Sequence, residues 1–185
     1  MRKPMILCLA LLILAASSGL AQKPEDQAGY FPIEELDLFP RDKLSVEINL
    51  AGALLRMVAA ATRLEDPEFS AVISSLKSIQ VQVFPLTGID EGSVKSKLDR
   101  AVRWLEGRGW SPTVRVREGG EETYIYLKET DGKIDGLSLL SLKPGEEAVA
   151  INIVGRIDPA QIGRLGQSLN IPHLEKTPAA GKKPE

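Results

Sequence analysis

The sequence has only one cysteine, Cys8, and one histidine, His173. Cys8 lies in an apolar run near the N-terminus, so a chain that loses this run has no thiol and forms no disulfide. Zinc usually needs several cysteine or histidine ligands, and a catalytic triad holds its histidine with a third group. We therefore expect His173, which follows Pro172 near the C-terminus, to be an exposed residue rather than a ligand or a base.

Long hydrophobic runs are also missing. The longest, residues 6–14, is shorter than the roughly 20 residues of a membrane-spanning helix. Arg2 and Lys3 precede it, and small residues end it at Gly19 and Ala21. This layout predicts a cleavable export signal over residues 1–21 and no transmembrane helix after cleavage. Because no cysteine stands at the cleavage point, we expect a periplasmic or secreted protein and not a lipoprotein.

Clustered positive charge is the third absence. Removing Arg2 and Lys3 with the signal lowers the basic count from 23 to 21, against 25 acidic residues, and gives a net charge of −4. Nucleic acids and anionic membranes are bound by clustered lysines and arginines. We therefore expect no nucleic-acid partner.

The remaining length is typical of one domain. Residues 22–29 are polar and predict a flexible leader, and residues 175–185 have no apolar period and predict a disordered tail. The folded unit is then 30–174. Alternating apolar residues predict strands, and apolar residues at helical spacing predict helices, as do Asp-Pro pairs at helix starts. The expected strands are 45–50, 79–83, 112–117, 122–128, 134–142 and 147–155, and the expected helices are 54–62, 66–76, 90–106 and 158–169.

Glycine-containing pairs separate the last four strands at hairpin spacing, and Asp131-Gly132 is typical of a two-residue turn. The order of elements predicts the α+β class: a two-layer sandwich of a mainly antiparallel sheet with amphipathic helices on one face. Most of the strands carry one apolar and one polar row, as expected for a sheet that is covered on one side.

Three patterns resemble catalytic or metal sites but fit them poorly. Ser74 and Lys77 have the Ser-x-x-Lys spacing of penicillin-recognising enzymes, but the partner motifs are missing, so a solvated helix end is favoured. Glu129, Asp131 and Asp135 supply too few oxygens for a calcium loop. Any two of the 25 acidic residues could meet in a hydrolase site, which makes that reading unspecific. We name no catalytic residue or metal ligand and expect no cofactor.

A set of polar strand residues is expected on the sheet face opposite the helices. Such a face can bind a partner or a glycan, although an ordinary wet sheet face is favoured. Its residues are Glu47, Asn49, Gln80, Gln82, Arg115, Arg117, Tyr124 and Tyr126.

Asn152 stands among apolar residues of the last strand, and Ala148 and Ala150 share its side. These small residues allow a close approach by a ligand, whereas a buried amide with all its hydrogen bonds satisfied is the simpler interpretation of Asn152.

Several segments carry a resemblance to a known family: Trp110 to Arg117, 131–137 and 147–159, with a looser match at 46–55 and 79–84. On these residues, the C-terminal half resembles a bacterial secreted family known only as domain of unknown function 4252. The resemblance extends over about 45–170 and implies an export or lipoprotein signal, an α+β domain and an accessory role in the envelope. It implies no catalytic residues.

Three functions stay open at this stage. The leading hypothesis is a non-enzymatic envelope or periplasmic protein that acts through a protein partner. The second is a small-ligand or lipid binder that holds its ligand between sheet and helices. The third is a hydrolase with converging carboxylates. A lined pocket of a few hundred cubic ångströms would favour the second or third.

Overall fold

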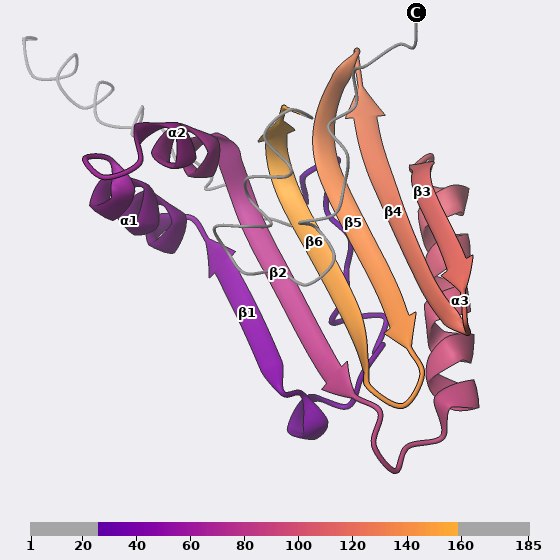
Figure 1. The fold of residues 1–185 in the computed structure, drawn as a ribbon. Helices are drawn as coiled ribbons and strands as arrows, with labels where there is room; N and C mark the ends of the chain where they lie inside the picture. Colours follow the sequence, from indigo (N-terminus) through magenta and orange to yellow (C-terminus); the bar gives the residue numbers. More distant parts are fainter. Residues whose placement is uncertain (1–25, 159–185) are drawn as a thin grey trace, which may run out of the picture.

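The computed structural model describes residues 26–158, which form one antiparallel six-stranded sheet and three α-helices (Figure 1). The α+β class is confirmed. The predicted signal, the last predicted helix, His173 and the predicted tail lie outside these residues. The strands are β1 (Val46–Ala51), β2 (Leu76–Pro85), β3 (Ser111–Glu118), β4 (Glu121–Thr130), β5 (Lys133–Lys143) and β6 (Glu147–Ile157); the helices are α1 (Ala53–Thr62), α2 (Pro67–Ser75) and α3 (Glu91–Gly107), and a short 3₁₀ turn, η2 (Arg41–Lys43), precedes β1.

The turns and caps form where the sequence predicts them. Asp66 caps α2 by accepting a hydrogen bond from the backbone N–H of Phe69 at 2.9 Å, and Pro67 follows as the first helical residue. Asp131 and Gly132 both have positive φ, 52° and 71°, as a two-residue hairpin turn of the primed type requires. These local signals set the element boundaries to within a few residues of the predicted ones.

The strand order is β1-β2-β6-β5-β4-β3. The last of the described strands in sequence, β6, therefore lies in the middle of the sheet and pairs with β2 and β5. Helix α3 connects β2 to β3, which lies at the far edge of the sheet (Figure 1). Within the described residues, β1 and β3 are the two edge strands.

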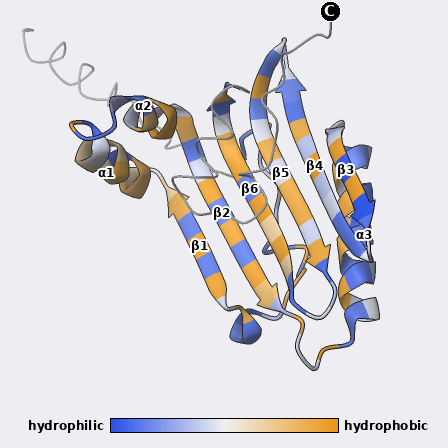
Figure 2. Cartoon of the chain, in the orientation of Figure 1, coloured by the Kyte–Doolittle hydropathy of each residue, from blue (hydrophilic) through white to orange (hydrophobic). Residues whose placement is uncertain are grey.

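The sheet has an apolar face and a mixed face. The apolar face carries rows of aliphatic side chains that run across neighbouring strands, for example Val81, Ile151, Leu139 and Ile125 (Figure 2). The mixed face combines aliphatic and aromatic residues with polar ones such as Asn152. In β4, β5 and β6 the side chains of both faces are buried, so each face needs a cover.

The helices lie on both faces rather than on one, which corrects that detail of the expectation. Helix α3 packs on the mixed face through Val94, Leu98 and Leu105. Helices α1 and α2 pack on the apolar face, where Leu55 and Ile73 join the buried cluster. The alternation in the sequence predicts one polar and one apolar face. In the structure, the face that carries the polar residues also carries aliphatic and aromatic ones, so both faces are partly apolar. A sheet with two apolar surfaces buries them with helices on either side.

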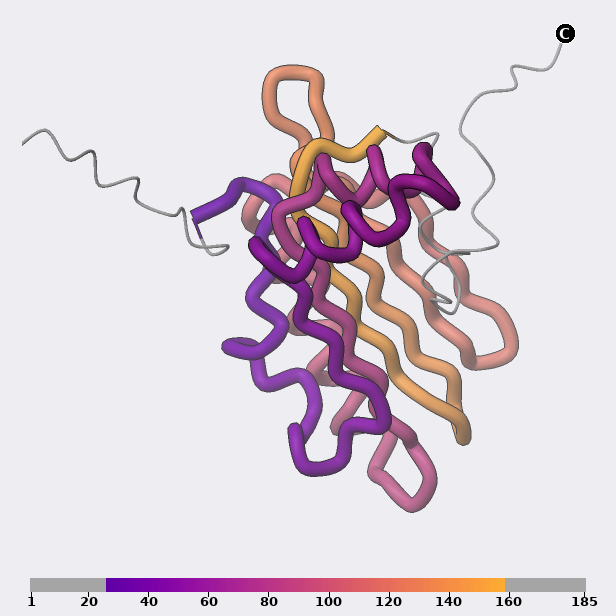
Figure 3. The backbone as a smooth tube through the Cα atoms, turned by 90° about the vertical axis from the view of Figure 1, so that its left-hand side faces the viewer, coloured from indigo at the N-terminus to yellow at the C-terminus, as the bar shows by residue number. Residues whose placement is uncertain are grey.

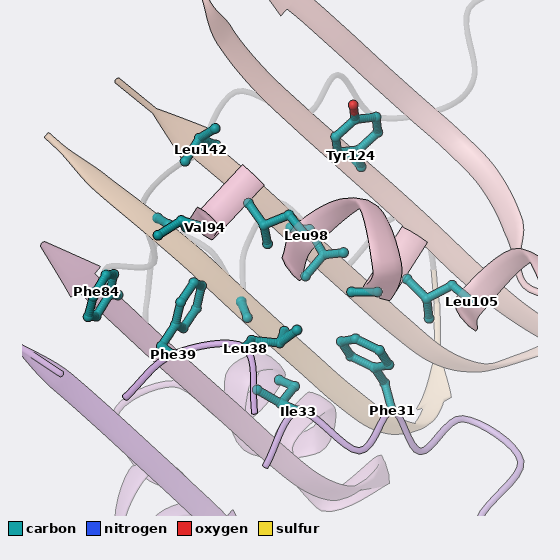
Figure 4. Close-up of a cluster of buried hydrophobic side chains, with 14 of the residues drawn as sticks. Phe31, Ile33, Leu38, Phe39, Phe84, Val94, Leu98, Leu105, Tyr124 and Leu142 are labelled. Carbon is teal, nitrogen blue, oxygen red and sulfur yellow. The ribbon is translucent and has the colours of Figure 1, made fainter. Parts of the chain in front are cut away.

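A segment without helix or strand completes the cover of the mixed face. We call residues 29–39 the strap. Phe31, Ile33, Leu38 and Phe39 of the strap are buried and point toward the sheet beside α3 (Figure 4). The ring of Phe39 stacks on Phe84 with a centroid distance of 5.3 Å. Figure 3 shows the strap, in indigo, on one side of the sheet and α1 and α2, in purple, on the other.

The strap enters the fold at a close contact of two glycines. A Cβ atom on Gly29 would lie 2.0 Å from the carbonyl oxygen of Asp135, and one on Gly136 would lie 2.5 Å from the Cα of Gly29. Both positions therefore exclude any side chain. Gly29, which the sequence assigns to the polar leader, lies directly on β5.

Candidate functional site

The eight polar strand residues do not form one open face. Gln80, Gln82, Tyr124 and Tyr126 are buried in the mixed face, which α3 and the strap cover. The remaining four are exposed and divided between the two edges of the sheet, with Glu47 and Asn49 on β1 and Arg115 and Arg117 on β3. The expectation of a wet sheet face is therefore corrected. The first four residues are buried because α3 and the strap cover them, and the sequence pattern does not reveal the strap.

At the β3 edge, Tyr126 joins three elements. Its hydroxyl donates to Glu106 Oε1 of α3 at 2.9 Å and accepts from Arg115 Nη2 of β3 at 3.1 Å. Arg115 also forms an ion pair with Glu106. Burial and the hydrogen bond to Glu106 raise the pKa of Tyr126 above 10.

A second group of the same composition lies one pleat along the same strands. The Tyr124 hydroxyl donates to Glu122 Oε2 at 2.6 Å and accepts from Arg117 Nη2 at 2.8 Å, while Lys95 of α3 forms an ion pair with Glu122. Burial acts to raise the pKa of Glu122, but the hydrogen bonds from Lys95 and Tyr124 outweigh it and leave this pKa below its ordinary value of 4.5.

Together these two Arg–Tyr–Glu groups fasten the edge strand β3 to β4 and α3. Charged acceptors and donors make such hydrogen bonds stronger than neutral ones. Because Arg115 and Arg117 are 48% and 67% exposed, solvent screens most of the ion-pair energy. The arrangement therefore orders the edge of the sheet.

Asn152 is the buried amide that the sequence singled out, and all its hydrogen bonds are accounted for. Its Oδ1 accepts from the backbone N–H of Phe31 at 3.0 Å, and its Nδ2 donates to the carbonyl oxygens of Gly29 at 3.0 Å and Leu137 at 3.2 Å. The interpretation as a satisfied amide is confirmed. Ala148 and Ala150 allow a close approach, and the strap occupies that space rather than a ligand. Both alanines pack in the buried cluster that contains the strap residues.

Buried polar atoms continue on either side of Asn152. Gln80 and Ser138 flank it in the cross-strand register. Among the residues described, Gln80 Oε1, Ser138 Oγ and Ser78 Oγ are buried without a hydrogen-bond partner. A cavity of about 210 Å³ opens where the strap begins, lined by residues that include Gly29, Lys77 and Arg156. It is smaller than the usual range of small-molecule pockets, about 300–1,000 Å³.

A wider depression of about 450 Å³ lies at the end of the β5–β6 pair. Glu129, Lys133 and Arg156 line it together with Asp158, the last residue that the structure describes.

The weaker motifs do not form sites in this part of the chain. Ser74 lies in the last turn of α2 with its Oγ donating to the carbonyl oxygen of Ser70 at 2.8 Å, whereas Lys77 lies in β2. Serine and lysine therefore do not share the helical turn that the Ser-x-x-Lys chemistry uses. Asp131 occupies the hairpin turn. Residues 26–158 contain no group of three or more potential metal ligands and no helix that could cross a membrane.

An exposed apolar stripe on α1 was not anticipated from the sequence. We call Leu54 and Met57 of α1, together with Leu64 in the turn that follows the helix, the α1 stripe; their exposed fractions are 48%, 66% and 95%. Leu55 and Ala59, on the opposite side of the same helix, are buried. Helix α1 thus carries apolar residues on both sides, a pattern typical of a helix with a second partner.

Comparison with known families agrees with this architecture. The family model described as Domain of unknown function (DUF4252) matches residues 41–165, which include the whole sheet, all three helices and η2. No curated protein matches the sequence. Since the match extends over more than half of the chain, this protein belongs to the DUF4252 family.

Proposed function

We propose that this protein is an exported accessory protein of the envelope or periplasm that binds another protein through the α1 stripe. The sequence of residues 1–21 supports the export. The stripe carries the binding proposal, because three large apolar side chains exposed together along α1 and the turn after it mark an interaction surface more often than an ordinary one.

The charges around the stripe define the partner's chemistry. Arg56 and Arg63 stand seven residues apart, so they share one side of the helix, and both are exposed. Neither forms a salt bridge with residues 26–158. A complementary partner presents an apolar groove or helix with acidic residues at its rim. The acidic residues Glu65, Asp66 and Glu68 follow directly and would repel an anionic lipid surface, which favours a protein over a membrane.

The test is site-specific photocrosslinking in the cells that make the protein. A photoreactive residue replaces Met57 in the stripe or, as the matched control, Arg100 on the exposed side of α3. We expect a discrete protein adduct from position 57 and none from position 100. Equal adducts from both positions, or none from position 57, would contradict the proposal.

A second substitution shows whether the adduct depends on the stripe. Leu64→Glu places a charge at a side chain that is 95% exposed, so the fold is unaffected. We expect the adduct at position 57 to fall about tenfold, which corresponds to a loss of about 1.4 kcal/mol in binding. An unchanged adduct argues against the stripe. Stripe-dependent binding of the purified protein to vesicles of phosphatidylglycerol would assign the surface to lipid instead.

A further inference from the structure

The geometry points to a further packing interaction within the chain: residues 158–170 form a helix that packs across the apolar face of the sheet, over β5, β4 and β3. The inference is independent of the α1 stripe. It begins from the part of this face that the described helices do not reach.

The apolar face extends beyond α1 and α2. In the described residues, these two helices pack against β1, β2 and β6, at the end of the sheet where β1 ends and β2 begins (Figure 1). The aliphatic row continues from Ile151 through Leu139 and Ile125 to Val114 on β3. Helix α3 lies on the opposite face and cannot cover it. Each such side chain stabilises the fold when it is removed from water.

The chain leaves β6 on the correct side. Ile157, the last residue of β6, belongs to the same buried cluster as Ile151 and Leu139. The segment that follows therefore starts at the apolar face, next to β5. A short turn is enough to direct it across the neighbouring strands.

The sequence after β6 has the properties of a covering helix. Asp158 and Pro159 provide a cap and a first helical residue. Ile162, Leu165 and Leu169 fall within a 60° sector of a helix, and Arg164 and Gln167 fall on the opposite side. Twelve helical residues extend about 18 Å. Crossing from β6 to β3 takes three strand spacings, about 14 Å. The apolar stripe thus matches the width of the face that α1 and α2 do not reach.

The first test compares cysteines on the two sides of this helix. The chain expressed from Gln22 onward lacks Cys8 and has no other thiol, so single cysteines can be introduced cleanly. We expect Leu165→Cys to react with a maleimide reagent at least about tenfold more slowly than Gln167→Cys, because only the former faces the sheet. Equal rates would overturn the inference. Protection that appears only as the protein concentration rises would assign the face to a second copy and would overturn it too.

The second test reads the sheet itself. Ser141 lies on the apolar face, 1% exposed, with its Oγ 3.0 Å from Thr123 Oγ1; Ser138, three residues earlier on the mixed face, is fully buried. Removal of residues 159–185 should raise the labelling rate of Ser141→Cys about tenfold or more and leave Ser138→Cys protected. Removal of residues 175–185 alone should change neither rate. Continued protection of Ser141→Cys after the longer truncation would refute the covering helix.

If both cysteines become reactive after the longer truncation, the shortened chain has unfolded. The comparison of Leu165→Cys with Gln167→Cys in the full-length chain then decides, because it needs no truncation.

Discussion

At the scale of single residues, Asn152 connects three separate parts of the chain. One amide group bonds the strap at Gly29 and Phe31 and the neighbouring strand at Leu137. Because the group is fully buried, its partners have no access to water when it is removed. Their unmet hydrogen bonds then count against the folded state.

We expect Asn152→Ala to lower the free energy of unfolding by about 2–4 kcal/mol, measured by urea denaturation. Asn49→Ala is the matched control: Asn49 is exposed on β1, and its single bond, to Glu34, is long at 3.5 Å. That variant should differ from the wild type by less than about 0.5 kcal/mol. Equal losses in the two variants would show that Asn152 does not hold the strap.

Glu122 predicts a pH dependence. Its pKa is lowered in the folded state, because hydrogen bonds from Lys95 and Tyr124 outweigh burial, so its contribution to stability is present above the unfolded value near 4.5. The contribution is lost as the pH falls through the folded pKa. Glu122→Gln should therefore be less stable than the wild type at pH 7, by about 1 kcal/mol or less because Lys95 is half exposed, and equally stable near pH 2.

The measurement is urea denaturation of both proteins between pH 2 and pH 7. Glu118→Gln, an exposed change at the end of β3, is the matched control for the loss of one carboxylate. A constant difference for Glu122→Gln would mean that the carboxylate is not held by its partners.

Residue-level sequence reasoning identified Asn152 correctly because a polar side chain in an apolar strand has few alternatives to a buried hydrogen bond. It misplaced Tyr124 and Tyr126, which it assigned to an open face. The alternation in β4 shows only that the two tyrosines share a side. Whether that side meets water depends on α3 and the strap, which come from distant parts of the sequence.

At the scale of elements, local chemistry determined most boundaries. Asp66 and Pro67 begin α2, and Asp131 and Gly132 form the turn between β4 and β5, as predicted. These signals act within four residues and need no tertiary information. The strap has no such signal, since its buried residues follow neither helical nor strand spacing. Its aromatic and aliphatic content was the only available indication.

The cap of α2 gives a prediction at this scale. Asp66→Ala should reduce the free energy of unfolding by about 1 kcal/mol, because the N–H of Phe69 loses its acceptor. Asp66→Ser keeps an acceptor at the cap and should recover most of the loss. Thermal or urea denaturation of the three proteins measures this. If the serine variant is as unstable as the alanine variant, the effect comes from lost charge and not from the cap.

At the scale of the whole molecule, β6 and its neighbours form the most protected part of the sheet. The residues from Ala148 to Val154 are almost completely buried, and β6 pairs on both sides, whereas β1 and β3 are edge strands whose side chains are exposed or half-buried. Amide hydrogens of β6 should exchange only on global unfolding, and those of β3 that face outward should exchange several orders of magnitude faster. Native-state hydrogen exchange tests this; comparable rates in β3 and β6 would contradict the strand order.

The class of fold and the antiparallel hairpins of β3 to β6 followed from sequence, because successive strands joined by tight turns pair with each other. The insertion of β6 between β5 and β2 did not. It joins residues more than 70 positions apart, such as Gln80 and Asn152, and no local signal encodes such a pairing. The α1 stripe was missed for a related reason, since an apolar helix in a sequence is normally assigned to the core.

The position of β6 also determines when this sheet can form. A polypeptide emerges N-terminus first, both from the ribosome and from a translocation channel, and the central strand here is the last to appear. Until it arrives, the β1–β2 pair and the β3–β5 meander have no common strand and Asn152 is not available to the strap. The chain therefore stays without a completed sheet while it is in transit, and the six described strands can join only after Ile157 has emerged.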